Sequence, residues 1–237
     1  MSHESLVLVL TAASLGFFHT LFGPDHYLPF IVMSRSGKWS LKKTTLVTIC
    51  CGIGHVLSSV VLGILGIAFG ITVTRLEVVE SIRGDIAAWA LIAFGLVYMV
   101  WGLRQASRNK RHEHSHGHGD GIIHSHSHDH TAEHTHVHGG EHRTSITPWV
   151  LFTIFVFGPC EPLIPLLMYP AAQGSLSGVF VVVGLFGGVT ILTMLSIVLV
   201  STFGINFIPT TRLERYTHAV AGATILLCGI GIRFLGL

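Results

Sequence analysis

Two short segments with the residues Phe-Gly-Pro hold the side chains that could do chemistry. The first reads HTLFGPDH and contains His19, Asp25 and His26. The second reads FGPCEP and contains Cys160 and Glu161. Both segments lie in long apolar stretches, where an ionisable side chain costs roughly 2.5–3.5 kcal/mol on insertion scales. Imidazole, thiolate and carboxylate groups are transition-metal ligands, so their gathering here predicts a metal site.

The first segment also has a spacing that suits a shared site. His19 and His26 are seven residues apart, so two turns of an unbroken helix would place them on one face. His55, in the segment GIGH, is a further histidine within an apolar stretch. We therefore predict that His19, Asp25, His26 and His55 coordinate a metal ion or line its path. Glu161 supplies a carboxylate from the second segment, and Cys160 is either a thiolate ligand or a packing residue.

The Gly-Pro pairs predict interruptions of two helices. Proline lacks a backbone N–H and glycine loosens the turn, so helices are expected to break at Gly23-Pro24 and at Gly158-Pro159. Non-helical backbone is tolerated at membrane depth only where protein or a cavity surrounds it.

Other roles for the same side chains stay open. A buried histidine such as His19 or His55 can simply bond a neighbouring backbone carbonyl. Asp25 can cap the helix that resumes after the break. Glu161 can bond the broken backbone or relay protons. The coincidence of polar residues with both breaks favours a shared metal site.

Composition and hydropathy indicate a protein of the membrane. The chain has 237 residues, of which 50% are apolar and 11% charged, and its mean hydropathy is +0.65. Residues 44–74 and 162–211 contain no charged side chain. Apolar runs of this length are typical of transmembrane helices. The predicted fold is an all-α integral membrane protein with six transmembrane helices, at residues 5–23, 45–70, 86–103, 148–170, 178–204 and 217–236.

The two halves of the chain, on either side of residues 104–147, resemble one another. FGPDHYLP at 22–29 matches FGPCEPLIP at 157–165, and FGLVYMVWGL at 94–103 matches CGIGIRFLGL at 228–237. We expect two three-helix repeats, at 1–103 and 148–237. Because three spans is an odd number, the repeats would be inverted in the membrane, with a site near the midplane lined by both.

Basic residues predict the orientation. With the N-terminus outside, eleven of the 14 Lys and Arg side chains fall in cytoplasmic loops, as the positive-inside rule requires. The placement of the basic residues therefore reflects membrane topology, and the net charge of +2 does not predict nucleic-acid binding. We expect the inner (plasma) membrane of a bacterium or archaeon. Pairing of the chain with copies of itself is left open.

Residues 104–147 form a polar, histidine-rich segment between the repeats. It holds 12 of the 17 histidines and is expected to lack a packed core. A dense array of imidazoles on the cytoplasmic side predicts weak binding of several metal ions, although inert low-complexity sequence is the alternative. The histidines are His112, His114, His116, His118, His124, His126, His128, His130, His134, His136, His138 and His142.

These motifs resemble those of the nickel/cobalt transporter superfamily. HTLFGPDH is similar to its His…Asp-His signature, closest in spacing to the hydrogenase and urease accessory permeases, and GIGHVLSS resembles its second signature. The resemblance implies that His19, Asp25, His26 and His55 line a metal path. The chain differs from the better-known importers, which have a shorter gap and eight spans.

A second resemblance points elsewhere. GPCEPLIPLL is similar to a helix of the thiol-disulfide electron carriers of bacterial membranes. Those carriers need a cysteine in each half, whereas Asp25 stands where the partner of Cys160 would be. Related families export sulfite or organosulfur anions, whose sites should offer cationic groups; no Lys or Arg is expected near the polar residues of this chain.

The sequence therefore predicts a membrane transporter, not an enzyme, of a divalent transition-metal cation, with Ni²⁺ or Co²⁺ favoured and Zn²⁺ an option. Alternating access, a lean towards efflux and proton antiport are expected. No phosphate loop or nucleotide-binding glycine motif occurs in the sequence. The alternative function is export of sulfite or organosulfur anions, or thiol-redox transfer on a related fold.

Overall fold

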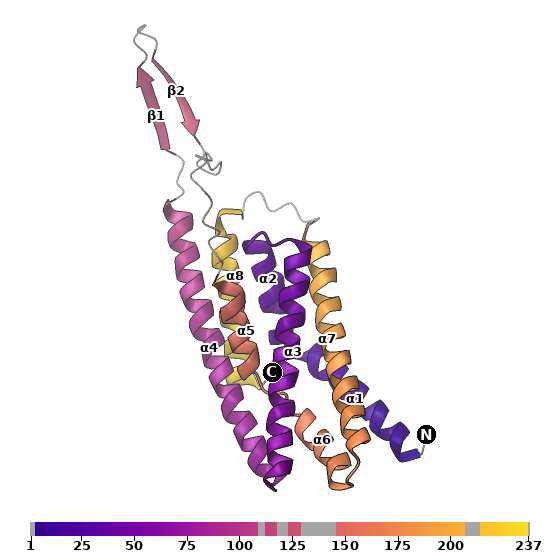
Figure 1. Ribbon diagram of the computed structural model, residues 1–237. Helices are drawn as coiled ribbons and strands as arrows, with labels where there is room; N and C mark the ends of the chain where they lie inside the picture. The colour runs from indigo at the N-terminus through magenta and orange to yellow at the C-terminus, as the bar shows by residue number, and fades with distance from the viewer. Residues whose placement is uncertain (1–2, 109–111, 118–122, 129–145, 207–213, 237) are drawn as a thin grey trace, which may run out of the picture.

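The computed structural model describes residues 3–108, 112–117, 123–128, 146–206 and 214–236. Among these residues, a bundle of helices forms the body of the protein, and a small pair of strands extends away from one end of it (Figure 1). Before the strands come α1 (His3–Phe22), the 3₁₀ turn η1 (Pro24–His26), α2 (Leu28–Ser36), α3 (Leu41–Ala68) and α4 (Val73–Arg108). After them come α5 (Thr147–Phe157), α6 (Leu163–Ala172), α7 (Leu176–Asn206), the 3₁₀ turn η2 (Glu214–Tyr216), α8 (Thr217–Ile230) and the π-helical turn η3 (Gly231–Leu235).

The bundle is that of an integral membrane protein. Within the described residues, five helical segments are long and apolar enough to cross a bilayer, at residues 3–22, 41–68, 73–108, 176–204 and 214–235. The helices α5 and α6 are apolar but shorter. The single span expected at 148–170 is therefore two short helices, separated by Gly158–Pro162.

Both predicted helix breaks are present. At the first, Gly23 adopts an extended conformation after α1, and Pro24 opens the turn η1. At the second, α5 ends at Phe157, Gly158 takes ψ 134°, and Pro159 and Pro162 precede α6. The prolines cannot donate to the helical ladder, so the backbone must find other partners at these two places.

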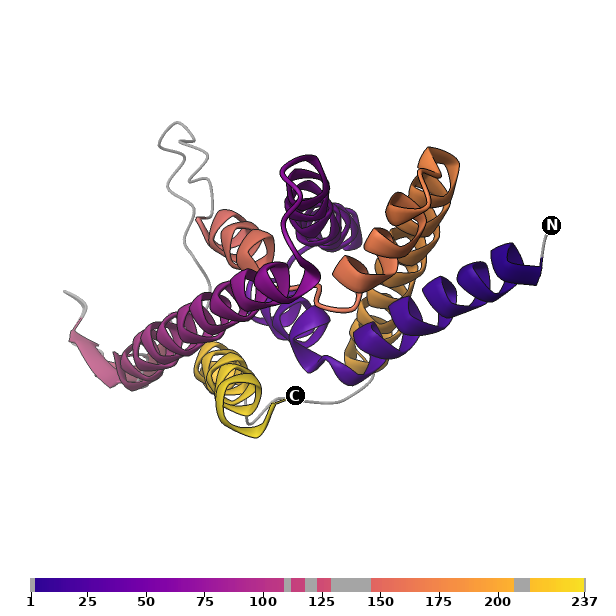
Figure 2. The same cartoon turned by 90° about the horizontal axis from the view of Figure 1, so that it is seen from below.

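The interrupted helices meet halfway along the bundle. In Figure 1, α1 rises from the N-terminus to the middle and α2 continues to the upper end, whereas α5 descends to the middle and α6 continues to the lower end. The end-on view of Figure 2 places α2, α3 and α5 close together between α4 on one side and α7 on the other. Segments far apart in the sequence thus meet at mid-height.

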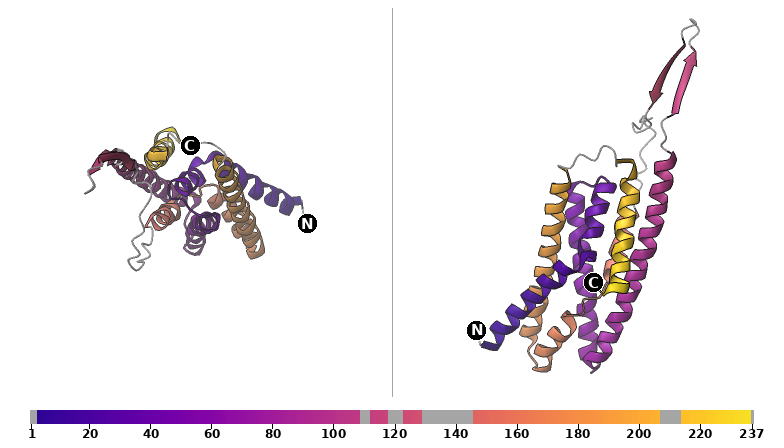
Figure 3. Two further views of the ribbon diagram at one scale, coloured as in Figure 1. Left: turned by 90° about the horizontal axis from the view of Figure 1, so that it is seen from above. Right: turned by 180° about the vertical axis from the view of Figure 1, so that it is seen from behind.

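The helix α4 is longer than predicted at both ends, since the expected third span was 86–103. Its first turns carry charges, but Leu76, Glu80 and Ala87 repeat at helical spacing and are buried. Its last turns read RQASR, which are good to moderate helix formers. Helix α4 packs along α8, where Gly95 and Gly222 let the two backbones approach, as Figure 3 shows from behind.

The histidine-rich segment contains regular structure where it is described. The strand β1 (His112–Gly117) pairs antiparallel with β2 (Ile123–His128), and the register sets His112 opposite His128, His114 opposite His126 and His116 opposite His124. A hairpin of this kind does not need the packed core that the sequence was expected to lack, because its strands can pair through backbone bonds alone. The predicted ligands His118, His130, His134, His136, His138 and His142 lie outside the described residues.

Candidate functional site

The first helix break holds His26 in a fixed orientation. His26 lies in η1 with 3% of its surface exposed. Its Nδ1 atom is 3.0 Å from Asp25 Oδ1 and 3.1 Å from Gly23 O. Both neighbours are oxygen acceptors, so Nδ1 carries the proton and Nε2 is left with its lone pair. A carboxylate behind a histidine is the usual way in which a metal-binding imidazole is oriented.

A second histidine faces the first from another helix. His55, on α3, is 2% exposed, and its Nδ1 is 3.4 Å from Phe155 O at the end of α5. The two Nε2 atoms of His26 and His55 are 3.3 Å apart. Two lone pairs at this distance need a proton or a cation between them. Nitrogen ligands at 2.0–2.1 Å from a tetrahedral metal are about 3.3–3.4 Å apart, which matches this spacing.

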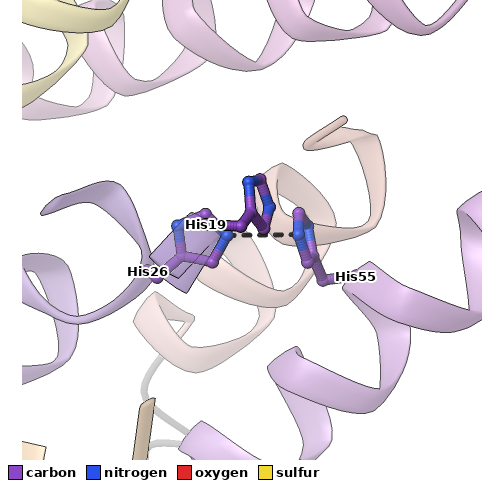
Figure 4. A group of neighbouring side chains, drawn as sticks. All are labelled: His19, His26 and His55. Atoms are coloured by element: carbon purple, nitrogen blue, oxygen red, sulfur yellow. Dashed lines mark hydrogen bonds between the residues drawn. The ribbon is translucent and has the colours of Figure 1, made fainter. Parts of the chain in front are cut away.

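The third histidine completes a cluster (Figure 4). His19, on α1, places its ring 4.7 Å from that of His26 and 6.2 Å from that of His55, between centroids. One ligand nitrogen from each of the three side chains lies within 4.8 Å of the others. Three imidazoles drawn from α1, η1 and α3 therefore converge on one point at mid-height in the bundle.

The other predicted site residues surround this cluster. Asp25 contacts the cluster through His26. Cys160 is fully buried, and its Sγ lies 3.8 Å from His19 Nε2. Glu161 is exposed and lines the same cavity as the histidines. The first break thus brings His26 into the cluster, whereas the second brings a thiol to the edge of the cluster.

A cavity of about 660 Å³ adjoins the histidines. Phe18 and Phe22 line it together with the cluster, and Asp85 and Arg233 form a further part of its wall. The Arg233 Nε atom lies 3.6 Å from Asp85 Oδ1. The cavity gives a ligand access to the cluster.

One ion pair near the site was not predicted. Glu80 and Arg83, on α4, are bonded at 2.5 Å, and Arg83 also donates to Val156 O and Gly158 O at the second break. The expectation that no Lys or Arg lies near the polar residues is therefore wrong. The predicted spans 45–70 and 86–103 leave the charges of residues 75–85 outside, yet Glu80 and Arg83 are three residues apart, a spacing that pairs side chains on one helix.

The cysteines do not pair with one another. All four are free; Cys50 is exposed, and Cys51, Cys160 and Cys228 are buried.

Comparison with known proteins identifies the family. Residues 29–231 match the model of the cytochrome c biogenesis protein transmembrane region. The match covers most of the chain, which therefore belongs to this family of membrane proteins. No curated protein and no solved structure matches significantly. His55 and Cys160 lie inside the matched region, whereas His19, Asp25 and His26 precede it.

The family corrects the functional prediction. Membership in the nickel/cobalt transporter superfamily is wrong, and so is the assignment of a nickel or cobalt transporter that followed from it. Short signatures of histidine beside a helix break suggested that superfamily, but the match over residues 29–231 is to a different one. The alternative prediction, a thiol-redox carrier on a related fold, agrees better with the family.

Proposed function

We propose that this member of the family binds one divalent transition-metal ion inside the membrane, through His19, His26 and His55. The observation that carries the proposal is the convergence of three imidazole nitrogens within 4.8 Å of one another. Two of them are already spaced as ligands of one ion. A cation held between these two nitrogens would satisfy the facing lone pairs of His26 and His55, as a shared proton would.

The proposed centre has three protein ligands and one open position. Such sites bind a water, a thiol or a small molecule in the fourth position, in contrast to closed structural sites. The candidates here are Cys160, whose Sγ lies beside His19, and a ligand entering from the cavity. The role is thus a binding role in a cytochrome c biogenesis-type membrane protein rather than that of a soluble enzyme.

The architecture that we propose around the centre is a pair of inverted three-helix repeats with six spans. Counting α5 and α6 as one interrupted span adds a sixth to the five long ones, and the opposite courses of α1–α2 and α5–α6 support the inversion. We further propose that the N-terminus is outside and that the histidine-rich segment is cytoplasmic, in a prokaryotic plasma membrane, where it binds metal weakly. Association with further copies stays a prediction.

Metal content of the purified protein tests the proposed centre. The full chain, with its twelve loop histidines replaced by serine and an affinity tag free of histidine, is equilibrated with Zn²⁺ as the probe. We expect one tightly held ion per chain by mass spectrometry of the metal, and none in His26→Ala. His218→Ala is the matched control, because His218 lies at the start of α8, bonds Tyr98 of α4 and is not part of the cluster. A wild-type chain without bound Zn²⁺ would refute the proposal.

A second candidate function is thiol-redox transfer by Cys160 alone. The family favours it, and so does the position of Cys160 at a helix break with His19 beside it. The thiolate would attack a disulfide of a partner protein, form a mixed disulfide and release one partner thiol. A dithiol of a second protein would then attack the Cys160 sulfur and release the partner fully reduced, and its other thiol would regenerate Cys160, which leaves the second protein as a disulfide. Trapping a mixed disulfide that disappears in Cys160→Ser, but persists in Cys50→Ser, would establish this function.

A further inference from the structure

A buried ion pair on α4 lies beside the second helix break. Glu80 is fully buried and the Arg83 side chain is 15% exposed. The Nη1 atom of Arg83 donates to Glu80 Oε1 at 2.5 Å and to Ser59 Oγ at 3.3 Å. A buried pair in a membrane protein is costly, so its presence calls for a role.

The pair satisfies the backbone groups that the break sets free. The Nη2 atom of Arg83 donates to Val156 O at 2.8 Å and to Gly158 O at 3.4 Å. On the other side, Glu80 Oε2 accepts from the backbone N–H of Cys160 at 3.1 Å. Groups that lack partners at this depth cost several kcal/mol each. One ion pair therefore fixes the chain on both sides of Pro159.

The same arginine also reaches His55. Ser58 Oγ donates to His55 O at 2.8 Å and accepts from Arg83 Nη2 at 2.6 Å. The ring of His55 has Phe155 O as its partner, and the next carbonyl along the chain, that of Val156, is held by Arg83. The backbone of His55 is thus linked to the guanidinium group through Ser58, and Val156, which follows the ring partner Phe155, bonds the same group directly.

These contacts leave Arg83 little capacity to bind a ligand itself. Each of its two terminal nitrogens has two N–H groups. Nη1 has two acceptors and Nη2 has three. The terminal donors of Arg83 are occupied by protein, so the arginine acts on the site through other residues.

We infer that Glu80 and Arg83 are positioning residues, which hold His55 Nε2 and Cys160 Sγ towards His19 and His26. The inference rests on the proposed metal centre for its functional meaning. The positioning of Cys160, however, can be measured without any metal.

The test compares variants of the full chain with the loop histidines replaced by serine. Arg83→Lys keeps the charge but loses the planar fork that serves several acceptors at once. The double variant Glu80→Leu/Arg83→Met removes both charges, so no unpaired charge remains to unfold the protein. Arg75→Met is the matched control, since Arg75 lies exposed on the same helix, about two turns before Arg83.

Three measurements are made on each variant that keeps the wild-type elution profile and helical circular dichroism. Zn²⁺ affinity, by competition with a chromophoric chelator, is expected to fall about 10–100-fold in both pair variants, as for other residues that orient metal ligands. The optical spectrum of Co²⁺, used as a probe of geometry, is expected to change as well. The alkylation rate of Cys160 by a maleimide, followed by peptide mass spectrometry without metal, is expected to rise.

The outcomes separate the two proposals. If the wild type binds Zn²⁺ and the pair variants match it in affinity, spectrum and Cys160 protection, the positioning role is overturned while the centre stands. If the wild type binds no Zn²⁺ but Cys160 becomes reactive in the pair variants, the centre fails and the positioning of the break stands. An equal effect of Arg75→Met would also overturn the inference.

Discussion

The two helix breaks share the residues Phe-Gly-Pro but differ in the contacts that they make. The first, around Pro24, carries His26 and Asp25, whose contacts at this point are local, with one another and with Gly23. The second, around Pro159, contributes backbone carbonyls and a thiol, and an ion pair from α4 supports it. In the proposed centre, one break therefore contributes an imidazole ligand, and the other forms the frame against which His55 of α3 is held.

This difference shows how a repeated motif can acquire two roles. Both prolines free backbone groups that need partners at membrane depth. At the first break, the imidazole of His26 bonds the carbonyl of Gly23 within the same turn. At the second, the partners come from residues some eighty positions away in the sequence. Substitutions at the first break should therefore alter metal affinity. Substitutions at the second should alter both metal affinity and the free energy of unfolding.

The largest expected effect is the loss of a ligand. His55→Ala should weaken Zn²⁺ binding more than the roughly 10–100-fold typical of residues behind a ligand, because one of the two closest nitrogens is removed. Competition with a chelator measures the affinity. His218→Ala should bind like the wild type; if His55→Ala also binds like it, the histidines are not a shared site.

The second-largest effect is expected on the free energy of unfolding, through the ion pair beside the second break. Glu80→Ala leaves Arg83 buried without its partner, which should lower the free energy of unfolding by about 3–5 kcal/mol. Unfolding in mixed micelles with increasing denaturing detergent measures this change. Glu77→Ala, one turn earlier on the exposed face of α4, is the control and should leave the midpoint unchanged. If Glu80→Ala and Glu77→Ala unfold at the same detergent midpoint, the ion pair does not stabilise the second break, and the two breaks do not differ in this respect.

A smaller effect is expected at the first break. Asp25→Asn keeps an oxygen near His26 Nδ1 but removes the negative charge, so Zn²⁺ affinity should fall about tenfold with little loss of stability. Chelator competition and the unfolding midpoint report the two quantities. Asp85→Asn, in the wall of the same cavity, should change neither. A large drop in stability with unchanged affinity would reverse the roles assigned to the two breaks.

The smallest effect should come from the histidine-rich segment. Replacing its twelve histidines by serine should remove weak metal binding and leave the tight site with the same affinity, since the bundle ligands come from α1, η1 and α3. Calorimetric titration with Zn²⁺ separates the tight site from the weak ones. A tight site that vanishes with these replacements would place it in the loop.

Much of the fold could be predicted from local patterns. Apolar runs at helical length located most of the membrane helices, because a bilayer leaves a chain few other ways to satisfy its backbone. The Gly-Pro pairs located both breaks for the same local reason. The start of α4 was not predicted, because charged residues such as Glu80 and Arg83 are typical of exposed segments. In the structure, Leu76, Glu80 and Ala87 are buried along this helix.

The family could not be read from the motifs. HTLFGPDH and GIGH report that histidines stand beside a break and on a neighbouring helix, and that arrangement is compatible with more than one family. The match over residues 29–231 rests on the pattern of the whole helical region. A few ligating residues constrain chemistry, whereas membership in a family depends on the many residues that pack the helices.

The sequence by itself determined which side chains would be placed in the membrane interior, because hydropathy and proline act locally. It therefore predicted His19, His26 and His55 as a candidate set. Only the tertiary structure decided that His26 and His55 point their Nε2 atoms at one another, that Cys160 lies beside His19, and that an ion pair of α4 holds the second break. Those relations join residues distant in sequence, and helix packing alone sets the distances between them.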